Sequence, residues 1–457
     1  MIEIITKINS AVNNFVWGPV MLLLLVGTGV YLTARTGCIQ AAKFGYIMRN
    51  TVGSLFRRRE KRDKDAKNLT PFQAVTTALA GTVGTGNIAG VTGAIFAGGP
   101  GAVFWMWFAA FFGMFTKFAE IVLALKYRQV DENGVHYGGP MYYIEKGLGM
   151  KWLAVLFSLV AGFACFGIGN ISQSSEIAGA MEGLFGMSGL TTGVLLAVVV
   201  GIVVLGGVQR IGRVTSYMVP FMAIFYIGAG LAVIRLRIDQ VPAALASIFT
   251  SAFSFEAVGG GVFGYAIMVA MRQGFARGVF SNEAGLGSAP MAHAASETQE
   301  PVEQGMWGVF EVFIDTIVIC TLTSLAVILS GVLDVGLDSY ATNGAAAVAA
   351  FNAILPGTIG GTIIQISLLF FALSTILGWS YYGERCWAYL SNNNKAVVWV
   401  FKVVFVLVCI VGATGNGTLM WDISDTLNGM MAIPNLIGLL LLSNVIIRST
   451  NDYFKKH

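Results

Sequence analysis

Apolar stretches of roughly twenty residues recur along almost the whole chain and are separated by short polar connections. About twenty apolar residues are needed for one helix to cross the hydrocarbon core of a bilayer. Of the 457 residues, 56% are hydrophobic and only 11% are charged, which excludes the common soluble classes. We therefore expect an all-α polytopic membrane protein that forms a single bundle.

The apolar pattern predicts about eleven membrane spans and one helix that lies at the membrane surface. The segment 239–256 is too polar to span and is expected to form this external interfacial helix. The predicted spans are 14–33, 70–97, 102–125, 153–181, 190–206, 214–234, 262–292, 305–328, 362–382, 396–410 and 420–447.

Lysine and arginine are concentrated between the first two spans, in the segment 34–69. Cytoplasmic loops carry such an excess, so we place this loop and the C-terminus in the cytoplasm and the N-terminus outside, in the plasma membrane. Arg235 and Arg237 lie at an external end and are accepted as exceptions. The run 57–67 is better explained by topology and attraction to anionic lipid than by a dedicated partner. The formal net charge of +4 likewise reports orientation and not nucleic-acid binding, and the sequence indicates no obligatory protein partner.

The three histidines and five cysteines are scattered, without the spacing of a metal site or a disulfide framework. A membrane enzyme would need a nucleophile or a metal set in the bilayer, which these residues do not supply. We therefore expect a protein that is not an enzyme and that uses no cofactor beyond a coupling ion. A channel would also be rich in small residues, but the sequence offers no charged pore ring.

Glycine-rich segments interrupt two of the predicted spans. The first break is Ala80-Gly-Thr-Val-Gly-Thr-Gly-Asn87, and the second runs from Ser281 to Ser288. Glycine weakens a helix by about 1 kcal/mol relative to alanine, and broken backbone persists in a bilayer only inside protein or beside a cavity. Each break is followed at similar spacing by an aromatic run, Phe104-Trp-Met-Trp107 or Met306-Trp-Gly-Val-Phe310. Matched interrupted helices are the best sequence indication of an inverted-repeat transporter.

The two predicted repeats contain five helices each. The first covers 70–237, and the second covers 238–447 together with the external helix. Residues 1–69 would form an extra N-terminal transmembrane helix and the basic loop, and 448–457 a cytoplasmic tail. The two broken spans are predicted to run in opposite directions, as an inverted repeat requires.

Two longer motifs resemble those of the alanine or glycine:cation symporter family, also called sodium:alanine symporters. They are Gly98-Gly-Pro-Gly-Ala-Val-Phe-Trp-Met-Trp-Phe-Ala-Ala-Phe-Phe-Gly113 and Arg277-Gly-Val-Phe-Ser-Asn-Glu-Ala-Gly-Leu-Gly-Ser-Ala-Pro290. The similarity covers nearly the whole chain. It implies a leucine-transporter type of fold and sodium-coupled uptake of alanine, glycine or another small neutral amino acid by alternating access. Proton coupling is the rival interpretation, and an ion channel is a more distant one.

The sodium ligands that the resemblance implies are carbonyl and hydroxyl oxygens, which replace water around a hard cation. A second sodium site at Thr82 and Asn87 is an alternative to plain helix-to-helix hydrogen bonding by Asn87. The ligands of the main site would be Ala80, Val83, Ser374 and Thr375.

The substrate would lie between the two breaks. Its carboxylate would meet the N–H groups of Thr85 and Gly86, because positive half-helix ends suit an anion. Its ammonium would meet carbonyl groups of the second break, from Phe280 through Ser281 to Asn282.

Three side chains are expected around this pocket. Asn170 and Gln173, at positions i and i+3 of the fourth span, would share one helical face and line the site, with helix packing as the alternative. Trp379 would close the apolar side and limit the substrate to a small side chain, or be an ordinary core tryptophan.

Glu283 lies inside the second break, where an acid is a functional candidate by default. It could bind the ammonium, carry a proton, or pair with Arg277 or Arg272 of the same helix. We favour the structural pairing, because sodium coupling through carbonyl groups needs no titrating acid. No role is assigned to the other acids in or near the spans, Glu120, Glu176, Glu311, Asp315 and Asp422.

Overall fold

The computed structural model describes residues 2–56, 67–253, 263–415 and 418–456 and is almost entirely helical. Within these residues, seven helices are long and apolar enough to cross a membrane, or nine if each of two bent pairs counts as one span. A helix or helix pair covers every predicted span, but α12 (Gly189–Val204) is short, and the number of crossings stays a prediction. Most of the basic run 57–67 lies outside the described residues.

The first break bends its span by 58° between α6 (Pro71–Thr82) and the segment 85–98. Thr70 caps α6, because Gln73 N donates to Thr70 Oγ1 over 3.1 Å and Thr70 N donates to Gln73 Oε1 over 3.1 Å. The helix ends at Thr82, a 3₁₀ turn covers Thr85–Asn87, and α7 (Ala89–Gly98) continues. The predicted interruption is confirmed.

The second break lies between α15 (Phe263–Asn282) and α16 (Pro290–Ala294). Three residues in it have positive φ, namely Glu283 at 56°, Gly285 at 95° and Gly287 at 82°. Glycine adopts this region without strain, whereas glutamate does so rarely, so the conformation of Glu283 must be held by its surroundings. The helix persists to Asn282, so the break begins two residues later than predicted.

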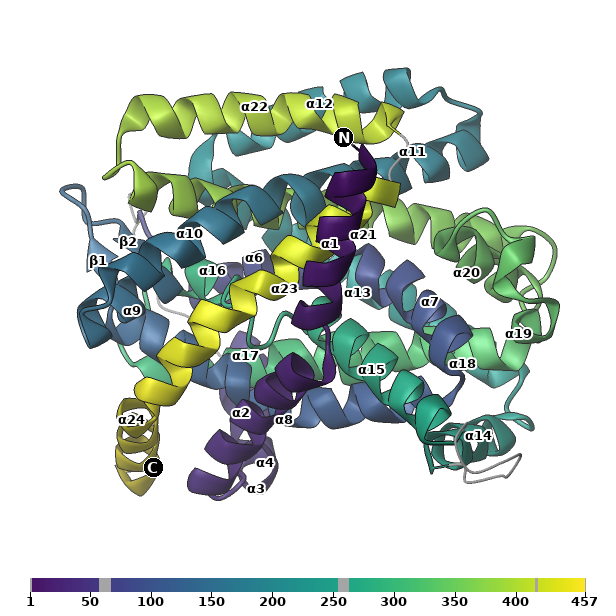
Figure 1. Cartoon of the computed structure of the whole chain (residues 1–457), viewed down its shortest axis with the longest axis horizontal. Coiled ribbons are helices and arrows are strands. Elements are labelled where there is room, and N and C mark those ends of the chain that lie inside the picture. Colours follow the sequence, from purple (N-terminus) through teal and green to yellow (C-terminus); the bar gives the residue numbers. More distant parts are fainter. Residues whose placement is uncertain (1, 57–66, 254–262, 416–417, 457) are drawn as a thin grey trace.

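The remaining elements surround these two broken spans (Figure 1). One predicted span, 153–181, contains a π-helix, η2, between α10 and α11, and 305–328 contains another, η3, between α17 and α18. The elements are α1 (Ile2–Val16), α2 (Pro19–Arg35), α3 (Ile39–Ala42), α4 (Phe44–Asn50), α5 (Val52–Leu55), α8 (Gly101–Lys126), β1 (Gln129–Val130), β2 (His136–Tyr137), α9 (Pro140–Leu148), α10 (Lys151–Phe166), η2 (Gly167–Ile171), α11 (Ser172–Phe185), α13 (Gly207–Leu236), α14 (Val241–Phe253), α17 (Pro301–Val312), η3 (Phe313–Cys320), α18 (Thr321–Ser330), α19 (Val332–Val335), α20 (Asn343–Asn352), α21 (Ile359–Leu390), α22 (Lys395–Thr414), α23 (Thr418–Leu441) and α24 (Ser443–Lys456).

Two groups of short elements lie at opposite ends of the molecule. The strands β1 and β2 with α9 are at the left of Figure 1, and α14, α19 and α20 are at the right. The predicted surface helix is present as α14, although residues 254–256 lie outside the described part. Within the segment 329–357, the alanine-rich part forms α20, which packs on α7 and α21.

Two predicted boundaries are wrong. The last span ends at Leu441 and not at 447, because the chain bends by 60° into the amphipathic helix α24. The span predicted as 362–382 is also longer, because α21 continues to Leu390.

Candidate functional site

The two breaks meet in the interior of the bundle. A methyl group on Gly86 of the first break would lie 3.3 Å from Cδ1 of Phe280 and 3.8 Å from Cα of Ser281 at the end of α15. Beside this contact is a small cavity of about 10 Å³ to which both broken spans, η2 and α21 contribute. Its lining residues are Gly81, Thr82, Gly84, Gly86, Ile168, Gln173, Phe280, Glu283, Thr375 and Trp379.

The residues predicted to hold sodium lie together at the inner side of the first break. Ser374 Oγ on α21 is 3.4 Å from the carbonyl oxygen of Val83 and donates to the carbonyl of Phe371 over 2.8 Å. Thr375 also contacts the break, since a methyl group on Gly84 would collide with its hydroxyl oxygen. Ala80 is fully buried one turn earlier, where α21 crosses α6.

Asn87 links the first break to a carboxylate that the sequence did not assign. Its Oδ1 accepts from Gly84 N over 2.9 Å, and its Nδ2 donates to Asp315 Oδ1 on η3 over 2.7 Å. Thr82 Oγ1 donates within its own helix, to the carbonyl of Ala78 over 3.3 Å. The arrangement favours the helix-to-helix hydrogen-bonding alternative for Asn87.

The residues at the end of α15 divide into two kinds. Phe280 lines the cavity. Ser281 Oγ instead donates to Asp315 Oδ2 over 2.9 Å, and Asn282 Nδ2 donates to Thr316 Oγ1 over 3.0 Å. Asp315 therefore contacts the first break and the end of α15 just before the second break. An acid in the eighth predicted span was the only sequence signal for it.

Asn170 and Gln173 do not share a face, so that prediction is wrong. Gln173 Oε1 accepts from Thr85 Oγ1 over 3.1 Å at the cavity, whereas Asn170 Nδ2 donates to the carbonyl of Phe405 on α22 over 2.7 Å. The cause is η2, because a π-helical turn holds an extra residue and shifts the register of an α-helical pattern. The backbone N–H of Ser172 donates to the carbonyl of Gly167, five positions earlier, which marks this turn. Asn170 joins helices and lies outside the cavity lining.

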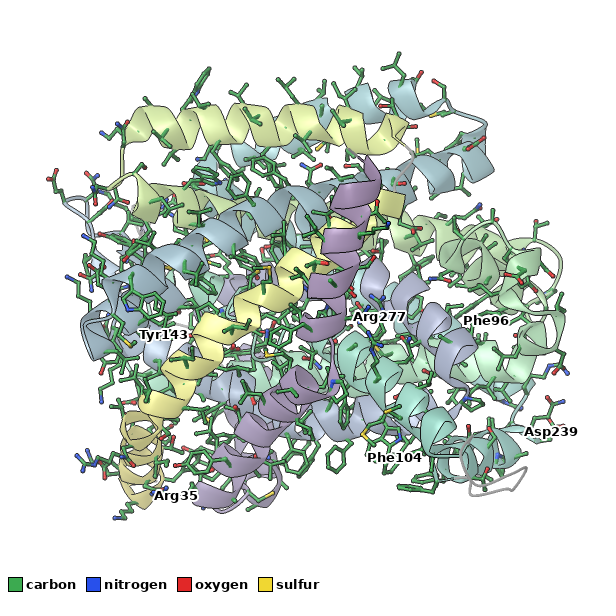
Figure 2. The ribbon with its side chains drawn as sticks, in the orientation of Figure 1. Arg35, Phe96, Phe104, Tyr143, Asp239 and Arg277 are labelled. Atoms are coloured by element: carbon green, nitrogen blue, oxygen red, sulfur yellow. The ribbon has the colours of Figure 1, made fainter. Side chains whose placement is uncertain are left out.

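Trp379 lines the cavity and hydrogen-bonds to Glu283. The indole Nε1 donates to Glu283 Oε1 over 3.0 Å, and Ser288 Oγ donates to Glu283 Oε2. The favoured pairing of Glu283 with an arginine is wrong, because Arg277 pairs with Asp425 at 3.6 Å and Arg272 donates to Asn14 over 3.1 Å. Figure 2 labels Arg277, a residue of α15, near the middle of the view.

The carboxylate of Glu120 on α8 accepts hydrogen bonds from two backbone amide groups of the second break. Its Oε1 accepts from Gly285 N over 3.0 Å, from Gly287 N over 3.1 Å and from Asn435 Nδ2 over 2.5 Å. Successive amides in such a turn form an anion-binding nest. An internal carboxylate therefore fills this nest.

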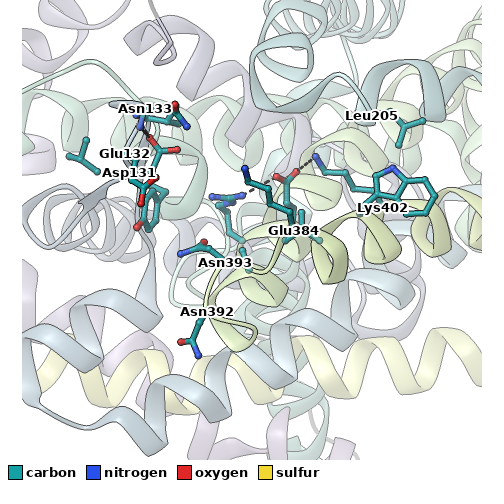
Figure 3. A pocket seen from close by; sticks show the side chains of 16 residues that line it. Asp131, Glu132, Asn133, Leu205, Glu384, Asn392, Asn393 and Lys402 are labelled. Carbon is teal, nitrogen blue, oxygen red and sulfur yellow. Dashed lines mark hydrogen bonds and ion pairs between the residues drawn. The ribbon is translucent and has the colours of Figure 1, made fainter.

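A larger cavity of about 830 Å³ lies elsewhere, around the 131–135 loop and the facing ends of α21 and α22 (Figure 3). Its central charges are paired with each other, because Glu384 contacts Arg385 at 2.9 Å and Lys402 at 3.0 Å. It shares no lining residue with the cavity between the breaks. The larger cavity is therefore separate from the two breaks.

The chain is similar to known proteins along almost its whole length. The sequence profile described as "Sodium:alanine symporter family" matches residues 2–457. "Sodium/alanine symporter AgcS" of Methanococcus maripaludis is 48% identical over 455 residues, which are 99% of this chain and 97% of that protein. "Amino-acid carrier protein AlsT" of Bacillus subtilis is 36% identical over 98% of this chain and 92% of its own.

Solved structures show the fold. MhsT, in complex with L-phenylalanine, superposes with a TM-score of 0.58 at 15% identity and covers 86% of this chain and 99% of its own. A manganese transporter of Eremococcus coleocola gives a TM-score of 0.52 at 15% identity, with 86% of this chain and 81% of its own covered. The predicted leucine-transporter type of fold is confirmed, and the protein is an integral membrane transporter. The chain belongs to the sodium:alanine symporter family.

Proposed function

We propose that this protein takes up alanine, glycine or another small neutral amino acid together with sodium, by alternating access. The observation that carries the proposal is the contact of Ser374 Oγ with the carbonyl of Val83, at 3.4 Å, where the broken helix α6 ends beside the cavity. Unwound carbonyls and hydroxyls are the ligands by which transporters of this architecture coordinate sodium. The similarity to a protein named as a sodium/alanine symporter supports the same coupling ion and substrate.

Sodium would bind between α6 and α21, held by Ala80, Val83, Ser374 and Thr375. The hydroxyls of Ser374 and Thr375 now donate to the carbonyl of Phe371, over 2.8 and 3.0 Å, and can rotate to present their lone pairs to a cation. Sodium would thereby fix α6 against α21. A second ion near Thr82 and Asn87 stays an additional proposal.

The substrate carboxylate would bind the N–H groups of Thr85 and Gly86 at the start of the 3₁₀ turn, where such groups lack helical partners. Phe280 and Trp379 would bound the apolar side chain of the substrate. Because both rings and the glycines leave little space, a small side chain is favoured.

Alternating access would require the inner end of the first broken span to separate from the segment after α16. Leu69 N donates to the carbonyl of Ala295 over 2.9 Å, and Glu297 N donates to the carbonyl of Leu69 over 2.8 Å. Arg128 strengthens this closure by donating to the carbonyls of Ser296 and Thr298, over 3.1 and 2.7 Å. Occupancy by both sodium and substrate would favour the rearrangement that breaks these bonds.

The proposal is tested by uptake of radiolabelled alanine into proteoliposomes. An inward sodium gradient should raise the initial rate well above that in potassium on both sides. Equal rates in the two conditions would reject sodium coupling, and uptake that follows a pH gradient without sodium would favour the proton-coupled rival.

We predict that Thr375→Ala raises the sodium concentration needed for half-maximal uptake by about tenfold, because one oxygen ligand is lost from a hard cation. Thr375→Ser, which keeps the hydroxyl, should stay within about twofold of the unchanged protein. The sodium dependence of initial alanine uptake measures both. An unaltered sodium requirement in Thr375→Ala would remove this residue from the proposed ion site.

A further inference from the structure

Glu283 is the one charged side chain among the residues that line the cavity between the breaks. It is only 2% exposed, so its carboxylate is withdrawn from solvent. Its neighbours around the cavity are glycines, Ile168, Phe280, Trp379, two threonines and Gln173, none of which carries a charge.

The position of this carboxylate is fixed by neutral donors. Trp379 Nε1 donates to one oxygen over 3.0 Å, and Ser288 Oγ donates to the other. The backbone of Glu283 holds a positive φ of 56°, which a non-glycine residue adopts rarely. The chain thus keeps a glutamate at a strained position and orients both of its oxygens, although neither donor neutralises its charge.

The nearby cations have other carboxylate partners. Arg277 pairs with Asp425 at 3.6 Å, and Lys117 pairs with Glu311 at 3.3 Å between two fully buried side chains. Within the described residues, no cation lies within ion-pair distance of Glu283. A buried carboxylate without a positive partner is costly, so it either takes up a proton or meets a cation that arrives from outside.

We propose that Glu283 is the acceptor for the ammonium group of the transported amino acid, an inference that rests on the proposed function. The zwitterion would then span the gap between the breaks, with its carboxylate at the amides of Thr85 and Gly86 and its ammonium at Glu283. Gly86 contacts Phe280, three residues before Glu283, so both binding groups adjoin one small cavity. Trp379 and Ser288 act as positioning residues that aim the carboxylate.

This assignment defines the substrate class by its amino group. A free primary ammonium supplies the charge and the hydrogen-bond donors that the carboxylate lacks. Glycine and alanine satisfy this requirement. Lactate, which has the size of alanine but carries a hydroxyl in place of the ammonium, leaves Glu283 uncompensated and is excluded, as is N-acetylalanine.

The experiment measures alanine affinity and the sodium response separately in purified protein. Radiolabelled alanine binding is determined in saturating sodium, and tryptophan fluorescence follows a sodium titration without alanine. We expect Glu283→Gln to weaken alanine binding by about 100-fold and to retain the sodium response, because a buried charge pair loses one partner. Glu283→Asp, which keeps the charge on a shorter stem, should weaken binding by less. Glu176→Gln, the same change at an acid outside the cavity lining, should bind alanine normally.

Competition in the unchanged protein tests the same inference without a substitution, so a variant that fails to fold does not decide the matter. Excess lactate or N-acetylalanine should leave alanine binding intact, and competition by lactate equal to that by unlabelled alanine would overturn the assignment. Normal alanine affinity in Glu283→Gln would overturn it as well. Loss of the sodium response together with alanine binding in folded Glu283→Gln would place the carboxylate at the ion and reject its role at the ammonium. If the unchanged protein bound no small amino acid in sodium, the proposed function itself would fail.

Discussion

Gly378→Ala is expected to lower sodium-driven alanine uptake by about tenfold or more, although the substitution adds only one methyl group. That methyl would lie 2.7 Å from the backbone nitrogen and 2.9 Å from Cα of Gly81, and 3.2 Å from the carbonyl carbon of Ala80. Each of these atoms belongs to the backbone, so no side-chain rotation relieves the contact. Small residues let membrane helices approach closely, and overpacking such a contact forces the helices apart.

The separation of α6 from α21 acts directly on the proposed sodium site. Ser374 lies one turn before Gly378 on α21, and its hydroxyl is already 3.4 Å from the carbonyl of Val83. Moving the helices apart by a few tenths of an ångström lengthens the distance between ligands that must contact one ion together. We therefore expect a raised sodium requirement as well as a lower maximal rate.

Gly90→Ala is the matched control, because Gly90 lies on α7 of the same broken span and a methyl group there meets no atom within 4 Å. It should preserve both the rate and the sodium dependence. Initial uptake at several sodium concentrations, normalised to the amount of folded protein in the proteoliposomes, measures the effect. A Gly378→Ala rate equal to that of Gly90→Ala would show that α21 does not press on the first break.

Backbone features near the site were predictable because their sequence signals are strong. Three glycines between Ala80 and Asn87 predicted the first break, which the structure confirms. The prediction that Asn170 shares a helical face with Gln173 was wrong because its sequence signal was weak. The i, i+3 rule assumes an α-helix, and the sequence 167–171 gives no clear sign of the π-helical turn that rotates Asn170 toward Phe405 on α22.

The buried acids were harder to place, since a sequence shows that an acid lies in a span but not what faces it. Glu120 is 165 residues from the amide of Gly285 that it accepts from, and Asp315 meets Asn87 across 228 positions. Glu283 was assigned to arginines of its own helix, the nearest cations in sequence. Those arginines contact Asn14 and Asp425 instead. The position of the Glu283 carboxylate at the cavity could be seen only in the three-dimensional structure.

Glu311→Ala is expected to produce the largest loss of stability, about 3–5 kcal/mol in the free energy of unfolding, because it leaves a buried charge without its partner. Lys117 Nζ lies 3.3 Å from Glu311 Oε1, and both side chains are fully buried. His293 Nε2 is 3.1 Å from Glu311 Oε2. Gln304 Oε1 accepts from Ser296 and Thr298, so the Gln304 amide nitrogen donates to Nδ1 of His293. The imidazole proton of His293 is then on its Nε2, which donates to Glu311.

Removing Glu311 therefore leaves two buried donors, Lys117 and His293, without their acceptor where α8, α16 and α17 meet. Asp425→Ala is the contrasting variant, because its pair with Arg277 is longer, at 3.6 Å, and the two side chains are 17% and 30% exposed. Solvent can compensate Arg277, so we expect a loss of about 1 kcal/mol or less. Thermal unfolding of the two variants in detergent compares them. Replacing Lys117 by Met in the Glu311→Ala background removes the stranded ammonium and should recover part of the loss. A double variant that is no more stable than Glu311→Ala would mean that packing around Glu311, and not the uncompensated charge of Lys117, accounts for the effect.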